Sequence, residues 1–275
     1  MVATPIGNAA DLSPRARAVL AAVDVIACED TRVTAKLLAL HGFSASLIAY
    51  HEHNAQRMRP VLIRRLEEGG TVALVSDAGT PLVSDPGYKL VREAISRGLP
   101  VTAVPGPSAP LAALVVSGLP SDRFLFSGFL PPRRSARRQA LAELTSLKAT
   151  LIFLEAKQRL AATLADMAEV LGPRPAAVAR ELTKLFEEVR RGPLPELARH
   201  YADTGPPRGE VTVVVGPPEA SAEDEASRGA DLDRRLDEAL GEGSLSDAVA
   251  KVSAATGLPR RQVYARALAL KEERG

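Results

Sequence analysis

Residues 72–87 read Val-Ala-Leu-Val-Ser-Asp-Ala-Gly-Thr-Pro-Leu-Val-Ser-Asp-Pro-Gly. An apolar run typical of a buried strand is followed at once by a loop with two Asp, two Pro and two Gly. In an open α/β sheet, ligands bind beyond the carboxyl ends of the strands. We therefore expect loop 76–87 to line a binding crevice, where Asp77 could accept hydrogen bonds from a ligand amine or hydroxyl.

Two further loops have the same character. Residues 4–8 read Thr-Pro-Ile-Gly-Asn, and residues 104–109 read Val-Pro-Gly-Pro-Ser-Ala after another apolar run. Ser108 can cap a helix over 109–116, whose free N–H groups would face the same sheet edge. Neither a dinucleotide fingerprint nor a P-loop is present. Three Pro/Gly loops at strand ends predict one shared crevice.

Short β-rich runs alternate with helical patterns through the first two thirds of the chain, which favours α/β architecture with a mainly parallel sheet. We expect strands over 23–28, 47–50, 72–76 and 101–105, then over 124–129, 150–154, 176–181 and 211–215. We expect helices over 34–41, 57–68, 135–147 and 159–171.

The predicted organisation has four parts. An N-terminal α/β domain over 1–119 ends near a Leu-Pro-Ser-Asp break, because Pro disfavours helix in the residue before it. A second α/β domain covers 120–217, and a polar linker covers 218–230. Residues 231–275 form a small helical module, in which Ser246 caps a helix to Ala255 and a Gly turn leads to a second helix from Arg260. This pattern fits a helix-turn-helix.

Composition excludes several classes. One cysteine among 275 residues allows no internal disulfide and no Cys-rich zinc site, so Cys28 is expected in the core. The longest apolar stretch, 109–119, is too short to cross a bilayer. No charged-then-apolar leader is evident, so we expect a cytoplasmic protein. A net charge of +2 permits an RNA partner without requiring one.

Charged and polar clusters supply further candidates. Glu29 and Asp30 are paired carboxylates that could do acid–base work. His51 and His53 lack a third plausible metal ligand in the sequence. The densest basic run holds Arg133, Arg134, Arg137 and Arg138 at a predicted helix start. Four cations there oppose the helix dipole, so a phosphate partner explains them better than local stability does. With 4% aromatic residues and no Trp, backbone contacts to RNA should dominate over base stacking.

These motifs, in this order, resemble the small-subunit ribosomal RNA methyltransferases of the tetrapyrrole-methylase superfamily. The resemblance runs from residue 2 to about 216, and the module around 246–270 resembles the helical C-terminal domain of the same enzymes. The segments that carry it are 2–8, 29–32, 50–54, 76–87, 105–109, 128–131, 180–188 and 208–210.

The resemblance implies two α/β domains with S-adenosylmethionine (SAM) in the cleft between them. The implied cofactor residues are Pro5, Asp77, Gly79, Thr80, Ser108, Ala109, Leu154, Glu181 and Thr212. The implied reaction is 2′-O-methylation of a cytidine in 16S rRNA near the decoding site, by a homodimer that needs no metal. Glu29 or Asp30 is the candidate base, and Arg32 joins the four arginines as an RNA contact.

One departure and two alternatives stay open at this point. Residues 156–159 read Ala-Lys-Gln-Arg where the family commonly has Ser-Pro-His-Arg, so residues 156–158 receive no role. C-methylation of a corrinoid or porphyrin precursor is one alternative, which the helical tail and the Arg run disfavour. A non-catalytic RNA-binding protein is the other, which the intact cofactor loops disfavour.

Overall fold

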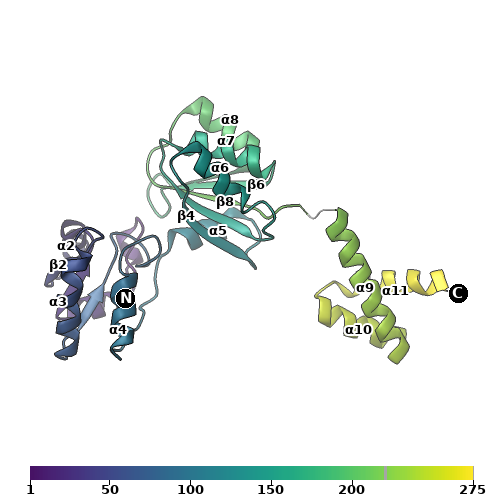
Figure 1. Cartoon of the computed structure of the whole chain (residues 1–275), viewed down its shortest axis with the longest axis horizontal. Coiled ribbons are helices and arrows are strands. Elements are labelled where there is room, and N and C mark those ends of the chain that lie inside the picture. Colours follow the sequence, from purple (N-terminus) through teal and green to yellow (C-terminus); the bar gives the residue numbers. More distant parts are fainter. Residues whose placement is uncertain (220–221, 275) are drawn as a thin grey trace. The chain divides into compact units, whose positions relative to one another are not determined.

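The computed structural model describes residues 1–219 and 222–274, and the chain separates into two compact units, Met1–Pro218 and Glu219–Gly275. The first unit contains two sheets, each with its own helices (Figure 1). No helix among the described residues combines the length and hydropathy needed for a membrane span.

The first sheet has three parallel strands in the order β2-β1-β3. Its strands are β1 (Val25–Cys28), β2 (Leu47–Ala49) and β3 (Val72–Leu74), and the helices around it are α1 (Pro14–Ala22), α2 (Thr31–Leu40), α3 (Ala55–Glu67) and α4 (Tyr88–Ser96), preceded by the 3-10 turn η1 (Ala9–Asp11). All four residues of β1 are buried, as expected for a central parallel strand covered on both faces. Cys28 is 0% exposed, which confirms its place in the core.

The expected strand over 101–105 is reduced to one isolated bridge, between Val2 and Val104. The Val2 N–H donates to the Leu74 carbonyl, and the Val104 N–H donates to the Met1 carbonyl. These contacts seat residues 1–4 between β3 and segment 101–105, so the loops that follow all three segments lie at the same edge of the sheet.

The second sheet has five strands in the order β4-β5-β8-β6-β7. They are β4 (Phe124–Phe129), β5 (Thr150–Glu155), β6 (Pro175–Arg180), β7 (Glu188–Pro193) and β8 (Val211–Val215). Only β4 and β5 are parallel, whereas β8 pairs antiparallel with both β5 and β6, and β7 pairs antiparallel with β6. The prediction of mainly parallel strands is therefore wrong for this sheet.

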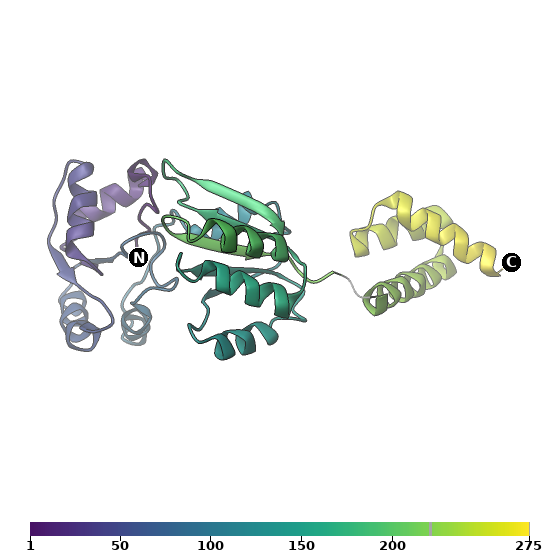
Figure 2. The same ribbon diagram turned by 90° about the horizontal axis from the view of Figure 1, so that it is seen from above.

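Alternate residues of the second sheet pack on opposite faces. Phe153 and Val213 belong to the core beneath α6 (Arg134–Ala142), α7 (Leu160–Leu171) and α8 (Leu194–Thr204), which lie side by side (Figure 2). Ile152 and Val214 face α5 (Ala109–Ser117) on the other side. Helix α5 thus packs on the second sheet, although its residues precede the predicted boundary at 119.

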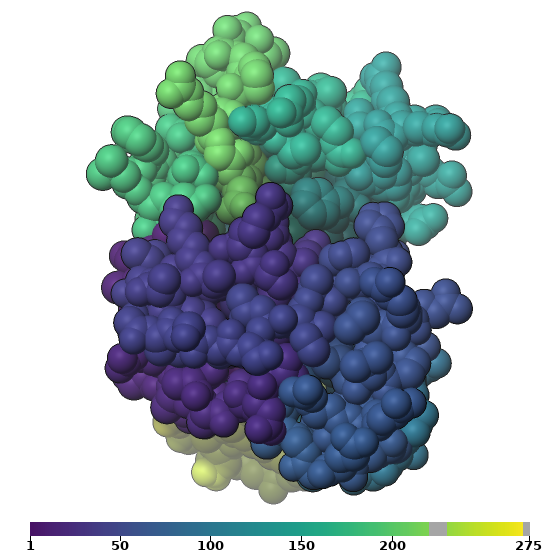
Figure 3. All heavy atoms as spheres, turned by 90° about the vertical axis from the view of Figure 1, so that its left-hand side faces the viewer, coloured from purple at the N-terminus to yellow at the C-terminus, as the bar shows by residue number. Residues whose placement is uncertain are grey.

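Noncovalent contacts, as well as the chain itself, join the two halves of the first unit. The Asn8 N–H donates to Thr183 Oγ1 at 3.0 Å. Ile6 also belongs to the same hydrophobic cluster as Leu182 of the second half. In the space-filling view, the purple-to-blue first half and the teal-to-green second half meet along a continuous seam (Figure 3). These contacts fix the walls of the cavity described below.

The C-terminal unit is a three-helix module of α9 (Ala222–Glu242), α10 (Leu245–Thr256) and α11 (Arg260–Arg274). Leu236, Val252 and Val263 bring one buried residue from each helix to its core. The predicted linker 218–230 is wrong from residue 222 onward, because the Ala/Glu-rich segment has high helix propensity and continues into the anchored part of α9. Ser244, rather than Ser246, caps α10, and Gly257 ends it at φ +70°.

Candidate active site

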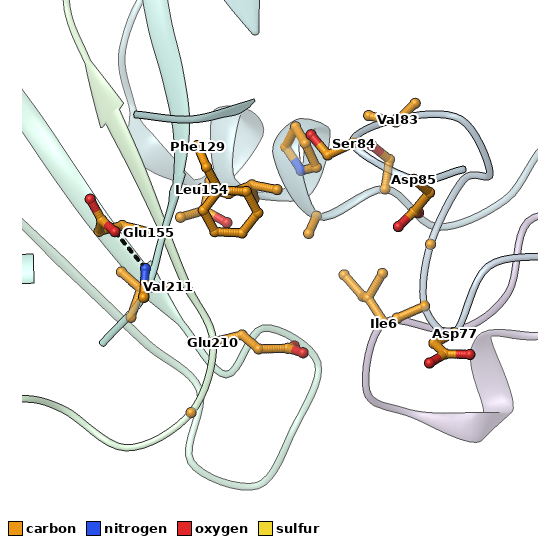
Figure 4. Close-up of a pocket in the computed structure, with 18 of the residues that line it drawn as sticks. Ile6, Asp77, Val83, Ser84, Asp85, Phe129, Leu154, Glu155, Glu210 and Val211 are labelled. Carbon is orange, nitrogen blue, oxygen red and sulfur yellow. Dashed lines mark hydrogen bonds between the residues drawn. The ribbon is translucent and has the colours of Figure 1, made fainter. Parts of the chain in front are cut away.

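A cavity of about 520 Å³ opens between the two sheets of the first unit (Figure 4). On one side its lining comes from the predicted Pro/Gly loops, including Ile6, Asp77, Asp85 and Ser108. On the other it comes from the ends of β4 and β5 and the start of β8, including Phe129, Leu154 and Thr212. The cavity has the size of a typical small-molecule site.

Loop 76–87 is held in place by the first segment of the chain. Thr4 and Gly79 exchange both backbone hydrogen bonds, at 2.9 and 3.0 Å, and Thr80 Oγ1 donates to the Pro107 carbonyl at 3.0 Å. Gly79 has φ +81°, a conformation that glycine adopts without strain. The three predicted loops are thereby tied into a single wall.

The same loop stores backbone strain. Leu82 has φ +74° and Ser84 has φ +64°, a region that L-residues with a side chain rarely occupy. Such residues cost on the order of 1–3 kcal/mol each and cluster at functional sites. They turn the chain so that Val83, Ser84 and Asp85 all line the cavity.

Helix α5 contributes its N-terminus to the cavity through Ser108, Ala109 and Pro110. The expected side-chain cap by Ser108 is absent, although its carbonyl accepts the first helical hydrogen bond from Ala112. The hydroxyl and the free first-turn N–H groups therefore remain suited to a ligand anion.

Apolar side chains face one another across the cavity. Ile6 lies on the loop side, opposite Leu154 and Phe129, which is 59% exposed (Figure 4). Residues 156–158, which received no role from the sequence, also line the cavity. Glu155 is part of the lining, but its carboxylate accepts hydrogen bonds from Ala156 N, Arg159 Nε and Thr163 Oγ1 and holds the end of β5.

Seven of the nine predicted cofactor residues line this one cavity, namely Asp77, Gly79, Thr80, Ser108, Ala109, Leu154 and Thr212. Pro5 and Glu181 are outside this lining, and a direct contact between either of them and a cofactor stays a prediction. Glu181, at φ +50°, accepts from Lys184 Nζ at 3.0 Å and from the Glu210 N–H at 3.3 Å. Glu181 thus supports the segment that carries Gly209 and Glu210 into the cavity.

The carboxylates around loop 76–87 influence one another. The pKa of Asp85 is raised to about 6, mainly by burial and also by the negative charges of Glu29 and Asp77, while a hydrogen bond with the Ser76 hydroxyl acts in the opposite direction. Burial likewise raises the pKa of Glu29, with Asp77 and Asp30 acting in the same direction and His51 opposing them. Close carboxylates with raised pKa values are a mark of functional sites.

Asp30 is a poor base, contrary to the sequence prediction. Its carboxylate caps α2 by accepting from the Arg32 N–H at 2.8 Å, and it pairs with the Arg32 guanidinium at 2.6 Å. These hydrogen bonds lower the pKa of Asp30 to about 2. Neither Asp30 nor Glu29 belongs to the cavity lining, although the Asp30 N–H donates to Asp77 Oδ1 at 3.0 Å. Asp30 therefore contacts the cavity through Asp77, and Glu29 influences it through its charge near Asp85.

The arginine run is in large part structural, which corrects its interpretation as four RNA contacts. Arg137 is 5% exposed and its guanidinium lies 2.6 Å from the buried Asp166 of α7. Arg134 and Arg138 pair with Asp166 and with Glu169 one turn further along α7. Counter-charges on the neighbouring helix therefore offset the unfavourable dipole at the start of α6, a relationship the sequence could not reveal.

Two of the predicted RNA contacts are exposed at the surface. Arg133 is exposed just before α6, and the Arg32 side chain is 88% exposed while it pairs with Asp30.

The rings of His51 and His53 lie 6.0 Å apart. Within residues 1–219 and 222–274, no three His, Cys, Asp or Glu side chains are grouped to hold a metal ion.

The fold and its two-walled cavity define a class of protein. A family profile of the tetrapyrrole (corrin/porphyrin) methylases matches residues 1–198, and the RsmI C-terminal HTH domain matches residues 226–271. The chain therefore belongs to the tetrapyrrole methylase family, and within it to the group of ribosomal RNA small subunit methyltransferase I.

Two relatives that carry this last name illustrate the match. Ribosomal RNA small subunit methyltransferase I of Mesorhizobium japonicum is 52% identical over 276 residues, covering 100% of this chain and 92% of that protein. The enzyme of the same name from Escherichia coli O157:H7 is 44% identical over 270 residues, covering 98% and 93%.

Solved structures share the fold. Diphthine synthase superposes with a TM-score of 0.60 at 17% identity, covering 78% of this chain and 88% of that chain. Uroporphyrin-III C-methyl transferase from Thermus thermophilus, complexed with S-adenyl homocysteine, superposes with a TM-score of 0.52 at 20% identity, covering 78% and 95%. At these identities the likeness establishes architecture alone.

Sequence reasoning missed several residues of the site. Ile6, Asp85 and Phe129 all lie inside segments that the resemblance had marked, so their positions beside Pro/Gly loops were the available signal. Gly209 and Glu210 lie just before β8, the plainest strand in the sequence. The loop–strand rule therefore pointed to the right segments without selecting the side chains.

Proposed function

We propose that this protein transfers the methyl group of SAM to the 2′-hydroxyl of a cytidine ribose in 16S rRNA, near the decoding site of the small ribosomal subunit. The observation that carries the proposal is the convergence of three Pro/Gly loops and the edge of a second sheet on one cavity, in a chain 44–52% identical to relatives named for rRNA methylation. We also propose that it acts as a cytoplasmic homodimer.

The residues of the cavity fit SAM. The apolar surfaces of Ile6, Phe129 and Leu154 suit an adenine ring, and the N-terminus of α5 with Ser108 suits a carboxylate. The carboxylates of Asp77 and Glu210 supply negative charge for an ammonium group and a sulfonium. Because Gly79 has no side chain, a ligand can approach its backbone closely. A side chain at this position would lie beside Ile6 and the Pro107 carbonyl.

SAM supplies an electrophilic methyl group on a sulfonium when it is bound. The protein must orient the two reactants. Alignment of reacting groups can lower the activation barrier by about 7–11 kcal/mol in favourable cases. The tied wall of loops 4–8, 76–87 and 104–109 is suited to that task. Strained positions such as Leu82 and Ser84 indicate a wall held in one conformation by its surroundings.

The RNA partner is supported by surface charge and by the C-terminal unit. The predicted RNA contacts that keep solvent exposure are Arg32, Arg133, Arg134 and Arg138. The last two also form ion pairs with Glu169 of α7. Short helices joined by a turn, as in α10 and α11, recur in nucleic-acid-binding modules. We infer that phosphate contacts from these elements position the rRNA while the cavity performs the chemistry.

Methyl transfer to purified small subunits tests the proposal. The protein, radiolabelled SAM and small subunits from a strain lacking the gene are incubated, and the rRNA is digested to nucleosides for mass spectrometry. The expected product is 2′-O-methylcytidine from one position of 16S rRNA. Label on a base, label at many positions, or no label would contradict the proposal.

A further inference from the structure

Asp85 occupies a distinctive position at the end of loop 76–87. It follows Ser84, whose left-handed backbone conformation changes the direction of the chain. The carboxyl group of Asp85 points into the cavity (Figure 4). On the opposite side lie Phe129, Leu154 and Glu210. A carboxyl group placed there can reach a molecule held between the two walls.

The other carboxylates of the cavity are already engaged. Glu155 accepts three protein hydrogen bonds, Asp77 accepts the Asp30 N–H, and Glu210 accepts from Lys184 Nζ at 3.1 Å. Among the described residues, no Lys or Arg forms an ion pair with Asp85. Of the four, Asp85 is therefore the carboxylate best able to accept a proton from a substrate.

The surroundings of Asp85 increase its basicity. Burial is the main cause of the raised pKa of about 6, and the charges of Glu29 and Asp77 add to it, against the Ser76 hydroxyl. Lys157 and Glu210 line the cavity from the second half. A base is more effective when its pKa approaches the working pH, while it stays ionised near neutrality.

We propose that Asp85 is the general base of the methyl transfer and that Glu29, from outside the cavity, tunes it; this inference rests on the proposed function. The Asp85 carboxylate accepts the proton of the ribose 2′-hydroxyl as the oxygen forms its bond to the methyl carbon. The carbon–sulfur bond breaks, and its electron pair stays on sulfur. The products are the 2′-O-methyl ribose, a thioether and protonated Asp85.

The central experiment compares the full-length protein with Asp85→Asn, which keeps the shape of the side chain and removes the base. Asp122→Asn, at an exposed carboxylate before β4, is the matched control. Single-turnover methylation of small subunits and SAM binding by calorimetry are measured for each. We expect Asp85→Asn to lose at least about 10²-fold in rate, with SAM affinity within twofold of wild type and the control unchanged.

A second measurement does not depend on turnover. The carboxyl ¹³C resonance that disappears in Asp85→Asn should titrate in the wild-type protein with a midpoint near 6. Glu29→Gln removes a like charge and should move this midpoint, and the acidic limb of the pH–rate profile with it, to lower pH. A merely structural Glu29 would leave both where they are.

The possible failures are distinct. If wild-type protein places no methyl group on a ribose, the proposed function fails. If wild type methylates the ribose and Asp85→Asn does so within threefold of its rate, the assignment of the base is overturned. A parallel loss of SAM affinity in Asp85→Asn would overturn it too, because Asp85 would then be a cofactor-binding group. The assignment of Asp85 as the base would lose its physical basis if the Asp85 resonance titrated near 4. It would also lose that basis if Glu29→Gln left the titration midpoint of Asp85 unchanged.

Discussion

The guanidinium of Arg137 lies 2.6 Å from the carboxylate of Asp166, and the two side chains are 5% and 2% exposed. Arg137 Nε and the second terminal nitrogen both donate to Asp166 Oδ2, at 2.8 and 2.6 Å. This buried pair joins α6 to α7 above the second sheet. The basic run at 133–138 therefore contributes to packing as well as to surface charge.

Arg137→Gln should destabilise the protein strongly. Removing one partner of a buried pair costs about 3–5 kcal/mol, because the remaining charge is left without compensation. Arg134 and Arg138 also approach Asp166, so the lower end of that range is expected. Urea unfolding measures the change, with exposed Arg133→Gln as the control that should leave the midpoint unchanged. Equal midpoints for the two variants would contradict the structural role.

Arg133→Gln should instead weaken binding to RNA. Each phosphate neutralised on a single strand contributes about −0.7 to the slope of log K against log salt. We therefore expect the variant to flatten this slope by about 0.7, with unchanged SAM affinity. Filter binding to a 16S fragment between low and moderate salt supplies the slope. A wild-type slope would mean that Arg133 faces water in the complex.

Asp77→Ala should reduce SAM affinity. Asp77 lines the cavity and also accepts the Asp30 N–H, so the change removes a carboxylate acceptor and loosens the start of α2. Hydrogen bonds to charged groups are worth about 1.5–3 kcal/mol, which predicts a loss of about tenfold or more in Kd. Calorimetry with SAM measures it, and Asp122→Ala should bind like wild type. Unchanged affinity would rule out contact between Asp77 and the cofactor.

Asp85 and Asp30 should change stability with pH in opposite senses. Because the pKa of Asp85 is raised, the folded state keeps the Asp85 proton to a higher pH than the unfolded state does. The contribution of Asp85 to the free energy of unfolding therefore falls as pH rises from about 4 through about 6. The lowered pKa of Asp30 gives stability that is present above about 4 and lost as pH falls toward 2. Asp85→Asn should accordingly raise Tm at pH 7 and not at pH 4, whereas Asp30→Asn should lower Tm at pH 7. Thermal melts across this range would contradict the assignment if the two variants behaved alike.

Removal of residues 219–275 should leave SAM binding intact. Every residue lining the cavity precedes residue 213, and the C-terminal unit has a hydrophobic core of its own. Methylation of small subunits should fall if α10 and α11 contact RNA. The two assays together decide this, since full activity of the truncated protein would reduce the C-terminal unit to a role in stability or assembly.

The sequence predicted some elements well for identifiable reasons. β8 matches its predicted range because it is a compact run of β-branched residues, and β4 matches because three Phe and one Leu stand among its six residues. β7 was missed because Glu-Val-Arg-Arg-Gly-Pro lacks an apolar pattern, as an exposed edge strand can. The antiparallel order of the second sheet depends on long-range pairing of β8, which local patterns do not encode.

The site was predicted at the level of loops more than of side chains. Strand-end loops rich in Pro and Gly identified the wall that carries Asp77, Gly79 and Ser108. The left-handed turn at Leu82 and Ser84 is a tertiary property, so the placement of Asp85 could not be read from residue types. Arg137 was misjudged for the same reason, because its partner lies 29 residues away in the chain.

The central claim is that one ribose of 16S rRNA is methylated by this protein, and ribose-methylation mapping tests it most directly. 16S rRNA from cells with and without the gene is compared at every nucleotide. We predict that a single cytidine near the decoding site loses its 2′-O-methyl group in the deletion strain and regains it when the gene is restored. An identical methylation profile in the two strains would contradict the account.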